Sequence, residues 1–128
     1  MRTGVKLGTF QIGAPAKPGE GLRIGTTRRP PRGVAKSDWR RRGYFDVWLP
    51  VIAPSEALLR RYQKRIDDPR ARAALFKAYE RELARPPQRY IVELLAEMAS
   101  RTPIAIGCFC EDESRCHRSV LRRVIEAG

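Results

Sequence analysis

The first third of the chain alternates apolar and polar residues over short stretches, which is the pattern of β-strands. This alternation predicts strands over residues 5–12 and 22–27. Residues 13–21 between them contain two prolines and three glycines, so we expect a loop there. Residues 45–52 are apolar and partly β-branched and are predicted to be extended, although Pro50 interrupts them.

The middle of the chain has apolar residues at helical spacing. Ser55 is a good N-cap for a first helix, and Asp68 followed by Pro69 predicts the start of a second. Pro86-Pro87 ends the second helix, and a third is predicted over about residues 87–100. The residues expected to face the core from this third helix are Ile91, Leu94, Leu95 and Met98.

The C-terminal part gives the clearest signal for the fold. Residues 103–110 are nearly all apolar, which is typical of a strand buried on both faces. The polar residues 111–115 predict a loop, and apolar residues at helical spacing from Val120 onward predict a terminal helix. The sequence therefore predicts the α/β class: one compact domain over residues 1–128, with a small, mostly parallel sheet covered on both sides and flanked by helices.

Charge narrows the expected partners. The 128 residues include 26 Lys or Arg against 14 Asp or Glu, a formal charge of +12, and residues 28–42 are especially basic. Such a chain attracts polyanions, so nucleic acid or a phosphate-bearing ligand is the expected partner. Within this stretch, Trp39 and nearby Tyr44 would either stack on bases or turn inward to the core. Arginine-rich composition without any ligand explains the charge equally simply.

The absence of a signal peptide and of a membrane span indicates the compartment and the redox state of the cysteines. No apolar signal core follows Met1, and no apolar stretch is long enough to span a membrane. We therefore expect a cytoplasmic protein without membrane contact, in which the three cysteines are free thiols. No cofactor is predicted, and the sequence indicates no oligomeric state.

All three cysteines and the single histidine fall within residues 108–117. Cys108 and Cys110 are two apart on the predicted strand and so face the same side. Cys116 and His117 stand at the start of the terminal helix, where backbone N–H groups favour a thiolate or a bound anion. Ligands of parallel sheets bind beyond the carboxyl ends of the strands, which is where this segment lies.

Four interpretations of this segment are open. A metal site would use the three cysteines and His117, but the spacing is unlike that of zinc sites and adjacent Cys116 and His117 rarely reach one ion, so no metal is predicted. Cys116 and Arg122 match a phosphatase loop, yet in a helix they would lie about 9 Å apart along the axis and about 240° around it. The third interpretation is an anion-binding helix start, and the fourth is purely structural.

The leading hypothesis is that the helix start at residues 116–119 binds a phosphate-bearing ligand or nucleic acid. The anion contacts would be Arg118 and Ser119, helped by Arg28, Arg29 and Arg32. One alternative is a cysteine-thiolate enzyme with Cys116 as nucleophile and His117 beside it. Another is an interaction module with no active site.

Several motifs together resemble a known family. Cys108 is followed after seven residues by Cys116-His-Arg118, and upstream stand Arg28-Arg-Pro-Pro-Arg-Gly33 and Ala53-Pro-Ser55. This combination resembles the domain-of-unknown-function family 488, a group of small bacterial and archaeal proteins. The resemblance covers most of the chain and implies a compact α/β domain with a mostly parallel sheet.

Overall fold

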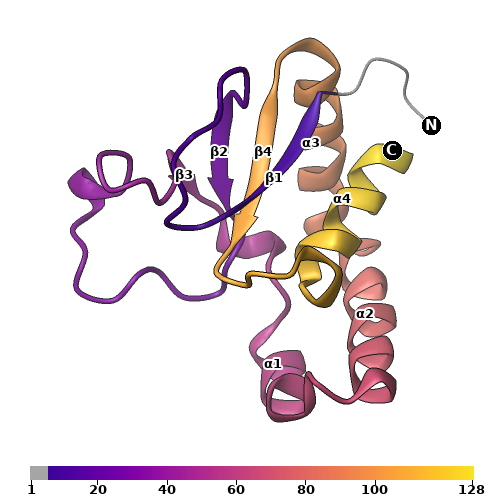
Figure 1. Cartoon of the computed structure of the whole chain (residues 1–128). Helices are drawn as coiled ribbons and strands as arrows, with labels where there is room; N and C mark the ends of the chain where they lie inside the picture. Colours follow the sequence, from indigo (N-terminus) through magenta and orange to yellow (C-terminus); the bar gives the residue numbers. More distant parts are fainter. Residues whose placement is uncertain (1–5) are drawn as a thin grey trace.

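The computed structural model describes residues 6–128 and contains a sheet of four parallel strands (Figure 1). The strands are β1 (Leu7–Gln11), β2 (Leu22–Gly25), β3 (Val47–Trp48) and β4 (Ile104–Cys108), in the spatial order β1-β4-β2-β3. The last strand in sequence therefore lies inside the sheet, and all five of its residues are buried. The α/β prediction is confirmed; Val5, which began the first predicted strand, lies outside the described residues.

Four α-helices accompany the sheet: α1 (Glu56–Tyr62), α2 (Pro69–Leu83), α3 (Gln88–Arg101) and α4 (His117–Ala127). Both predicted caps are confirmed. The Ser55 hydroxyl accepts a hydrogen bond from the Leu58 N–H at 3.3 Å, and the Asp68 carboxylate accepts one from the Arg70 N–H at 3.0 Å. Among the described residues, no helix has the length and apolar character needed to cross a membrane.

The helices build the main core against one face of the sheet. Ile24, Ile104 and Ile106 point from the strands into this core. The helical residues that meet them are Tyr79, Leu83, Val92, Leu95, Ala96, Ala99, Val120, Leu121 and Ile125. Since strand residues alternate between the two faces, Cys108 points to this helical side as well.

The prediction that Leu94 faces the core is wrong. The side chain of Leu94 is 56 % exposed, whereas Val92, Leu95, Ala96 and Ala99 face the core from α3. Successive helical residues are rotated by about 100°, so burying position 95 between 92 and 99 turns position 94 toward solvent. The apolar stripe of α3 is wider than the surface it buries, and only packing decides which edge stays exposed.

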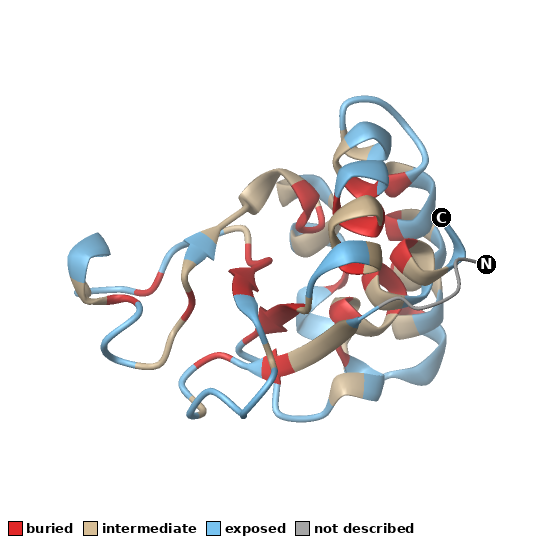
Figure 2. Ribbon diagram, turned by 90° about the horizontal axis from the view of Figure 1, so that it is seen from above, coloured by how far each residue is buried: buried red, intermediate tan, exposed pale blue. Residues whose placement is uncertain are grey.

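The opposite face of the sheet is covered by a loop. The segment between β2 and β3 extends away from the helices (Figures 1 and 2). Its Trp39 and Phe45 are buried with Phe10 and Ala105, and the two loop rings meet edge to face at 4.7 Å. The aromatic residues of the basic stretch therefore turn inward, as one of the two sequence interpretations expected.

Glycine in β4 is what lets an aromatic side chain lie directly on the sheet. A Cβ at Gly107 would stand 2.2 Å from the Phe10 ring, far inside any real contact distance. Any larger residue there would push Phe10 out of the loop-side core.

A buried arginine ties the loop to the sheet. Arg23 donates hydrogen bonds to the carbonyls of Gly43 (3.0 Å) and Ala14 (2.8 Å), and its guanidinium stacks 4.0 Å from the centre of the Phe10 ring. It also forms an ion pair with Glu20 at 2.8 Å, and both side chains are almost fully buried.

Candidate functional site

A cavity of about 560 Å³ lies beyond the carboxyl ends of β2 and β4. These strands are direct neighbours, with Gly25 opposite Gly107, so the residues that follow them meet at one edge of the sheet. The basic residues that line the cavity are Arg28, Arg29, Arg32 and Arg115. Apolar side chains in the lining include Leu59, Ile66 and Leu75, and among residues 6–128 no Asp or Glu lines the cavity.

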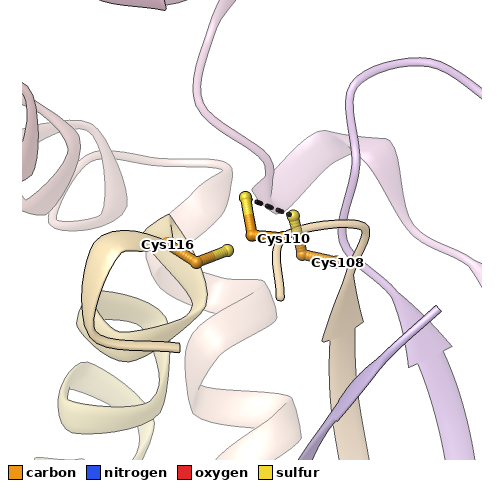
Figure 3. A group of neighbouring side chains, drawn as sticks. All are labelled: Cys108, Cys110 and Cys116. Atoms are coloured by element: carbon orange, nitrogen blue, oxygen red, sulfur yellow. Dashed lines mark hydrogen bonds between the residues drawn. The ribbon is translucent and has the colours of Figure 1, made fainter. Parts of the chain in front are cut away.

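The three cysteines gather at this cavity (Figure 3). Cys108 ends β4, Cys110 lies in the following turn, and Cys116 stands immediately before α4. Their Sγ atoms all lie within 4.8 Å of one another, and those of Cys108 and Cys110 are 3.8 Å apart. Cys110 is exposed, whereas Cys108 and Cys116 are buried. The turn after β4 thus brings the three thiols close together, although their spacing in the sequence is unlike that of zinc sites.

His117 joins the cysteine group from the first turn of α4. Its Nδ1 lies 3.9 Å from the Cys108 Sγ and 3.8 Å from the Cys116 Sγ. Its Nε2 lies 2.8 Å from the carbonyl oxygen of Thr26. A carbonyl oxygen only accepts, so Nε2 carries the hydrogen, and the lone pair of the neutral ring is on Nδ1, facing the sulfurs.

The adjacent residues Cys116 and His117 both reach the group because the chain changes conformation between them. Cys116 is extended (φ −106°, ψ 146°), and the helix begins at His117. We expected that adjacent Cys116 and His117 would rarely reach one ion, which holds where both residues have the same backbone conformation. The start of a helix removes that obstacle.

Hydrogen bonds among the three thiols decide which of them has the lowest pKa. Hydrogen bonds from the thiols of Cys108 and Cys116 hold the pKa of Cys110 well below its usual range. The hydrogen bond to Cys110 raises the pKa of Cys108 to about 11, and the neighbouring thiols Cys108 and Cys110 raise that of Cys116 still further. Burial lowers the pKa of His117. The most acidic thiol is therefore the exposed one.

Arg118 and Ser119, the predicted anion contacts on α4, do not line the cavity. The Arg118 side chain is buried, at 4 % exposure, and donates to the carbonyls of Cys110 (2.7 Å) and Cys108 (3.4 Å). The Ser119 hydroxyl donates to the Cys116 carbonyl at 2.8 Å. In this structure both side chains hold the backbone of the cysteine segment.

The three helper arginines do line the cavity. Arg28 donates to the carbonyls of Ala53 (2.8 Å) and Pro54 (3.1 Å), which fixes the loop beside α1. Arg29 is exposed and pairs with Glu56 at 3.1 Å. For Arg32, no ion pair occurs among residues 6–128.

The phosphatase interpretation does not fit this arrangement. Residues 117–127 form the regular helix α4, so Arg122 lies more than one turn beyond Cys116. The Arg122 guanidinium is held by the carboxylates of Glu113 (3.3 Å) and Glu126 (2.9 Å). Cys116 and Arg122 therefore do not form one phosphate cradle.

The likeness to a known family extends over nearly the whole chain. The sequence model described as the active DUF488-N3 subclade matches residues 7–128. The chain belongs to the DUF488 family. This confirms the resemblance first drawn from the Cys108 spacing and the Cys116-His-Arg118 motif. No curated protein and no solved structure matches the chain.

For this DUF488 member, sequence reasoning missed part of the cavity wall. Arg115 lies in the predicted polar loop, and Leu59 and Ile66 belong to the apolar residues at helical spacing in the middle of the chain. The loop's position directly between Cys110 and Cys116 was a usable signal for Arg115. Nothing local marked Leu59 or Ile66, because an apolar residue facing a cavity and one facing a core have the same spacing.

Proposed function

We propose that this DUF488 member binds a small phosphate-bearing molecule in the cavity at the carboxyl end of the sheet. The observation that carries the proposal is the lining, which combines four arginines with no carboxylate. Guanidinium groups bind phosphate oxygens through planar, paired hydrogen bonds. A cavity beyond the carboxyl ends of parallel strands is also the usual place for a ligand in α/β folds.

The remaining wall suggests what the rest of the ligand is like. Leu59, Ile66 and Leu75 present apolar surface, and the volume of about 560 Å³ falls within the range of small-molecule sites. A ligand with one anionic end and one apolar or planar end, such as a nucleotide, satisfies both parts. The matching family model is described as an active subclade, which is compatible with a ligand site.

The arginines differ in how free they are to bind. Arg29 and Arg115 are held by exposed ion pairs, with Glu56 in the first case and with Asp67 and Asp112 in the second. Exposed pairs of this kind are worth less than about 1 kcal/mol, so a phosphate can replace the carboxylate. Arg32 is exposed and is the side chain that we expect to make the main contact.

Calorimetric titration at low salt tests the proposal with inorganic phosphate, a nucleoside monophosphate, the matching nucleoside and a single-stranded oligonucleotide. We expect the monophosphate to bind at least about tenfold more tightly than the nucleoside. Arg32→Ala should weaken monophosphate binding by about 10–100-fold, the equivalent of one charge-assisted contact. Arg101→Ala, an exposed arginine at the end of α3, is the matched control and should leave the affinity unchanged.

Two results would contradict the proposal. The first is equal affinity of the unaltered chain and Arg32→Ala for the monophosphate. The second is binding of the oligonucleotide alone with a steep salt dependence, which would favour nucleic acid as the partner.

A further inference from the structure

Three cysteines and one histidine stand together in the lining of the cavity, and the proposed phosphate contacts do not use them. Cys108, Cys110 and Cys116 place their Sγ atoms within 4.8 Å of one another (Figure 3). The Nδ1 of His117 lies 3.9 Å and 3.8 Å from the sulfurs of Cys108 and Cys116. We propose that these four side chains bind a zinc-class metal ion, with three thiolate ligands and one imidazole ligand.

The separations match what such an ion requires. Zinc binds thiolate sulfur at about 2.3 Å and imidazole nitrogen at about 2.0–2.1 Å in a tetrahedron. Those lengths put two sulfur ligands about 3.8 Å apart, and a sulfur and a nitrogen ligand about 3.6 Å apart. The observed Cys108–Cys110 separation is 3.8 Å, and the distances from the His117 Nδ1 to the sulfurs of Cys108 and Cys116 are within 0.4 Å of the ideal. The remaining sulfur pairs lie within 4.8 Å, and the exposed Cys110 side chain would have to turn toward Nδ1. Small side-chain rotations would complete the tetrahedron.

The orientation of His117 is that of a metal ligand. Its Nε2 donates to the Thr26 carbonyl at 2.8 Å, so the lone pair of Nδ1 is directed to the sulfurs. Histidines that bind metals regularly donate their second ring nitrogen to a carbonyl or carboxylate in this way, which fixes the tautomer. The Tyr79 ring packs edge-on against the imidazole at 5.6 Å and limits its rotation.

The surroundings favour three thiolates around a dication. Such a centre carries a net charge of −1, and the buried Arg118 guanidinium supplies a nearby positive charge. Arg118 also fixes the main chain of two ligands through the carbonyls of Cys108 and Cys110. The amino end of α4, where Cys116 and His117 stand, further favours negative charge.

The donor set determines the class of ion. Thiolates favour zinc, cobalt and cuprous ions, whereas magnesium and calcium need oxygen ligands. Binding requires each thiol to lose its proton to solvent, so metal uptake by this site releases protons. No oxidant or reductant takes part.

The test uses the full chain, reduced and stripped of metal with a chelator, and titrated with Co²⁺ alone in phosphate-free buffer. We expect one Co²⁺ per chain, with thiolate-to-cobalt charge-transfer absorption in the near ultraviolet and the intense visible bands of a tetrahedral ion. Zn²⁺ should then remove both signals by displacement. A flat near-ultraviolet spectrum, or the weak visible bands of an octahedral ion, would overturn the proposal.

Variants separate the ligands. Cys110→Ser alters an exposed side chain, and it should lose about a third of the charge-transfer intensity per bound ion and at least about 100-fold in affinity. His117→Gln should shift the visible bands and weaken binding by at least about tenfold. Phe109→Ala is the matched control, because it lies between two ligands, is exposed and has no donor atom. An unchanged spectrum in Cys110→Ser would count against the site.

A further measurement does not depend on whether a variant folds. Thiol alkylation of the unaltered chain should modify Cys110 rapidly without metal and slowly with one equivalent of Zn²⁺. Equal rates in both conditions, or a disulfide among the three cysteines in freshly reduced protein, would contradict the site. Since the cobalt titration contains no phosphate ligand, its outcome is independent of whether the cavity binds a nucleotide.

Discussion

The two halves of the basic segment, residues 28–42, have similar compositions but opposite surroundings. In the first half, Arg28, Arg29 and Arg32 line the cavity at the carboxyl end of the sheet. In the second half, Arg40 pairs with Asp46 and Arg41 pairs with Asp38, each at 2.7 Å. These pairs belong to the loop that covers the opposite face of the sheet.

The difference shows that charge density along a chain does not locate a site. The second half has carboxylates close by in sequence, so each of these two arginines finds a partner within six residues. In the first half, Arg28 donates to backbone carbonyls and Arg29 pairs with Glu56, which is distant in sequence. For Arg32 no ion pair occurs among residues 6–128, and all three side chains line the cavity. A net charge of +12 describes both halves equally and distinguishes neither.

The largest loss of stability should come from detaching the second half of the basic segment from the sheet. Arg23→Met removes the donor to the Gly43 carbonyl and leaves Glu20 buried without its partner. We expect the free energy of unfolding, measured by urea denaturation, to fall by about 3–5 kcal/mol. Arg41→Ala, which breaks only an exposed pair, should stay within about 0.5 kcal/mol of the unaltered chain. Equal losses of unfolding free energy in the two variants would contradict the role of Arg23 in holding the loop to the sheet.

The next effect compares the two halves directly in ligand binding. Arg32→Ala should weaken binding of a nucleoside monophosphate by about 10–100-fold, whereas Arg41→Ala should change it by less than about twofold. The physical reason is that Arg41 already neutralises Asp38 and lies in the loop outside the cavity lining. Calorimetry on both variants at the same salt concentration checks this. A similar loss in both would mean that the charges act diffusely.

Arg28 should behave as a structural residue of the first half. Its guanidinium donates to the carbonyls of Ala53 and Pro54, so Arg28→Ala leaves both without this donor. We expect a loss of about 1–2 kcal/mol in the free energy of unfolding. Arg40→Ala, whose partner carboxylate is partly exposed, is the control and should lose less than about 1 kcal/mol. The reverse order in urea denaturation would contradict this division of roles.

The smallest effect should come from α1, which lines the same cavity as the first half of the basic segment. Ser55→Ala removes the cap of α1, the helix that carries Leu59, and should cost about 1 kcal/mol. Because loss of the cap lets the first turn of α1 fray, monophosphate affinity should fall by a few-fold while the fluorescence of the buried Trp39 stays constant. A shifted tryptophan spectrum together with unchanged affinity would show that α1 supports the loop and not the cavity.

Much of the fold follows from short-range signals in the sequence. The caps at Ser55 and Asp68, the apolar run that becomes β4 and the terminal helix are all where the pattern predicts them. These features are local, because a cap or a strand is specified by residues a few positions apart. The spacing of Cys108 and Cys116-His-Arg118, together with the motifs at residues 28–33 and 53–55, indicated the family that the match over residues 7–128 shows.

What the sequence by itself determined was the α/β class, most of the elements and the family. Only the tertiary structure decided that Leu94 faces solvent, that Arg118 is buried beneath the cysteine turn and that the three sulfurs gather with His117 beside two of them. Each of these depends on how separate elements pack, and the contact can join elements distant in sequence, as when the carbonyl after β2 orients the imidazole of α4 across 91 positions. The spacing of apolar residues indicates which face of a helix or strand is apolar, whereas tertiary packing determines which residues that face contacts.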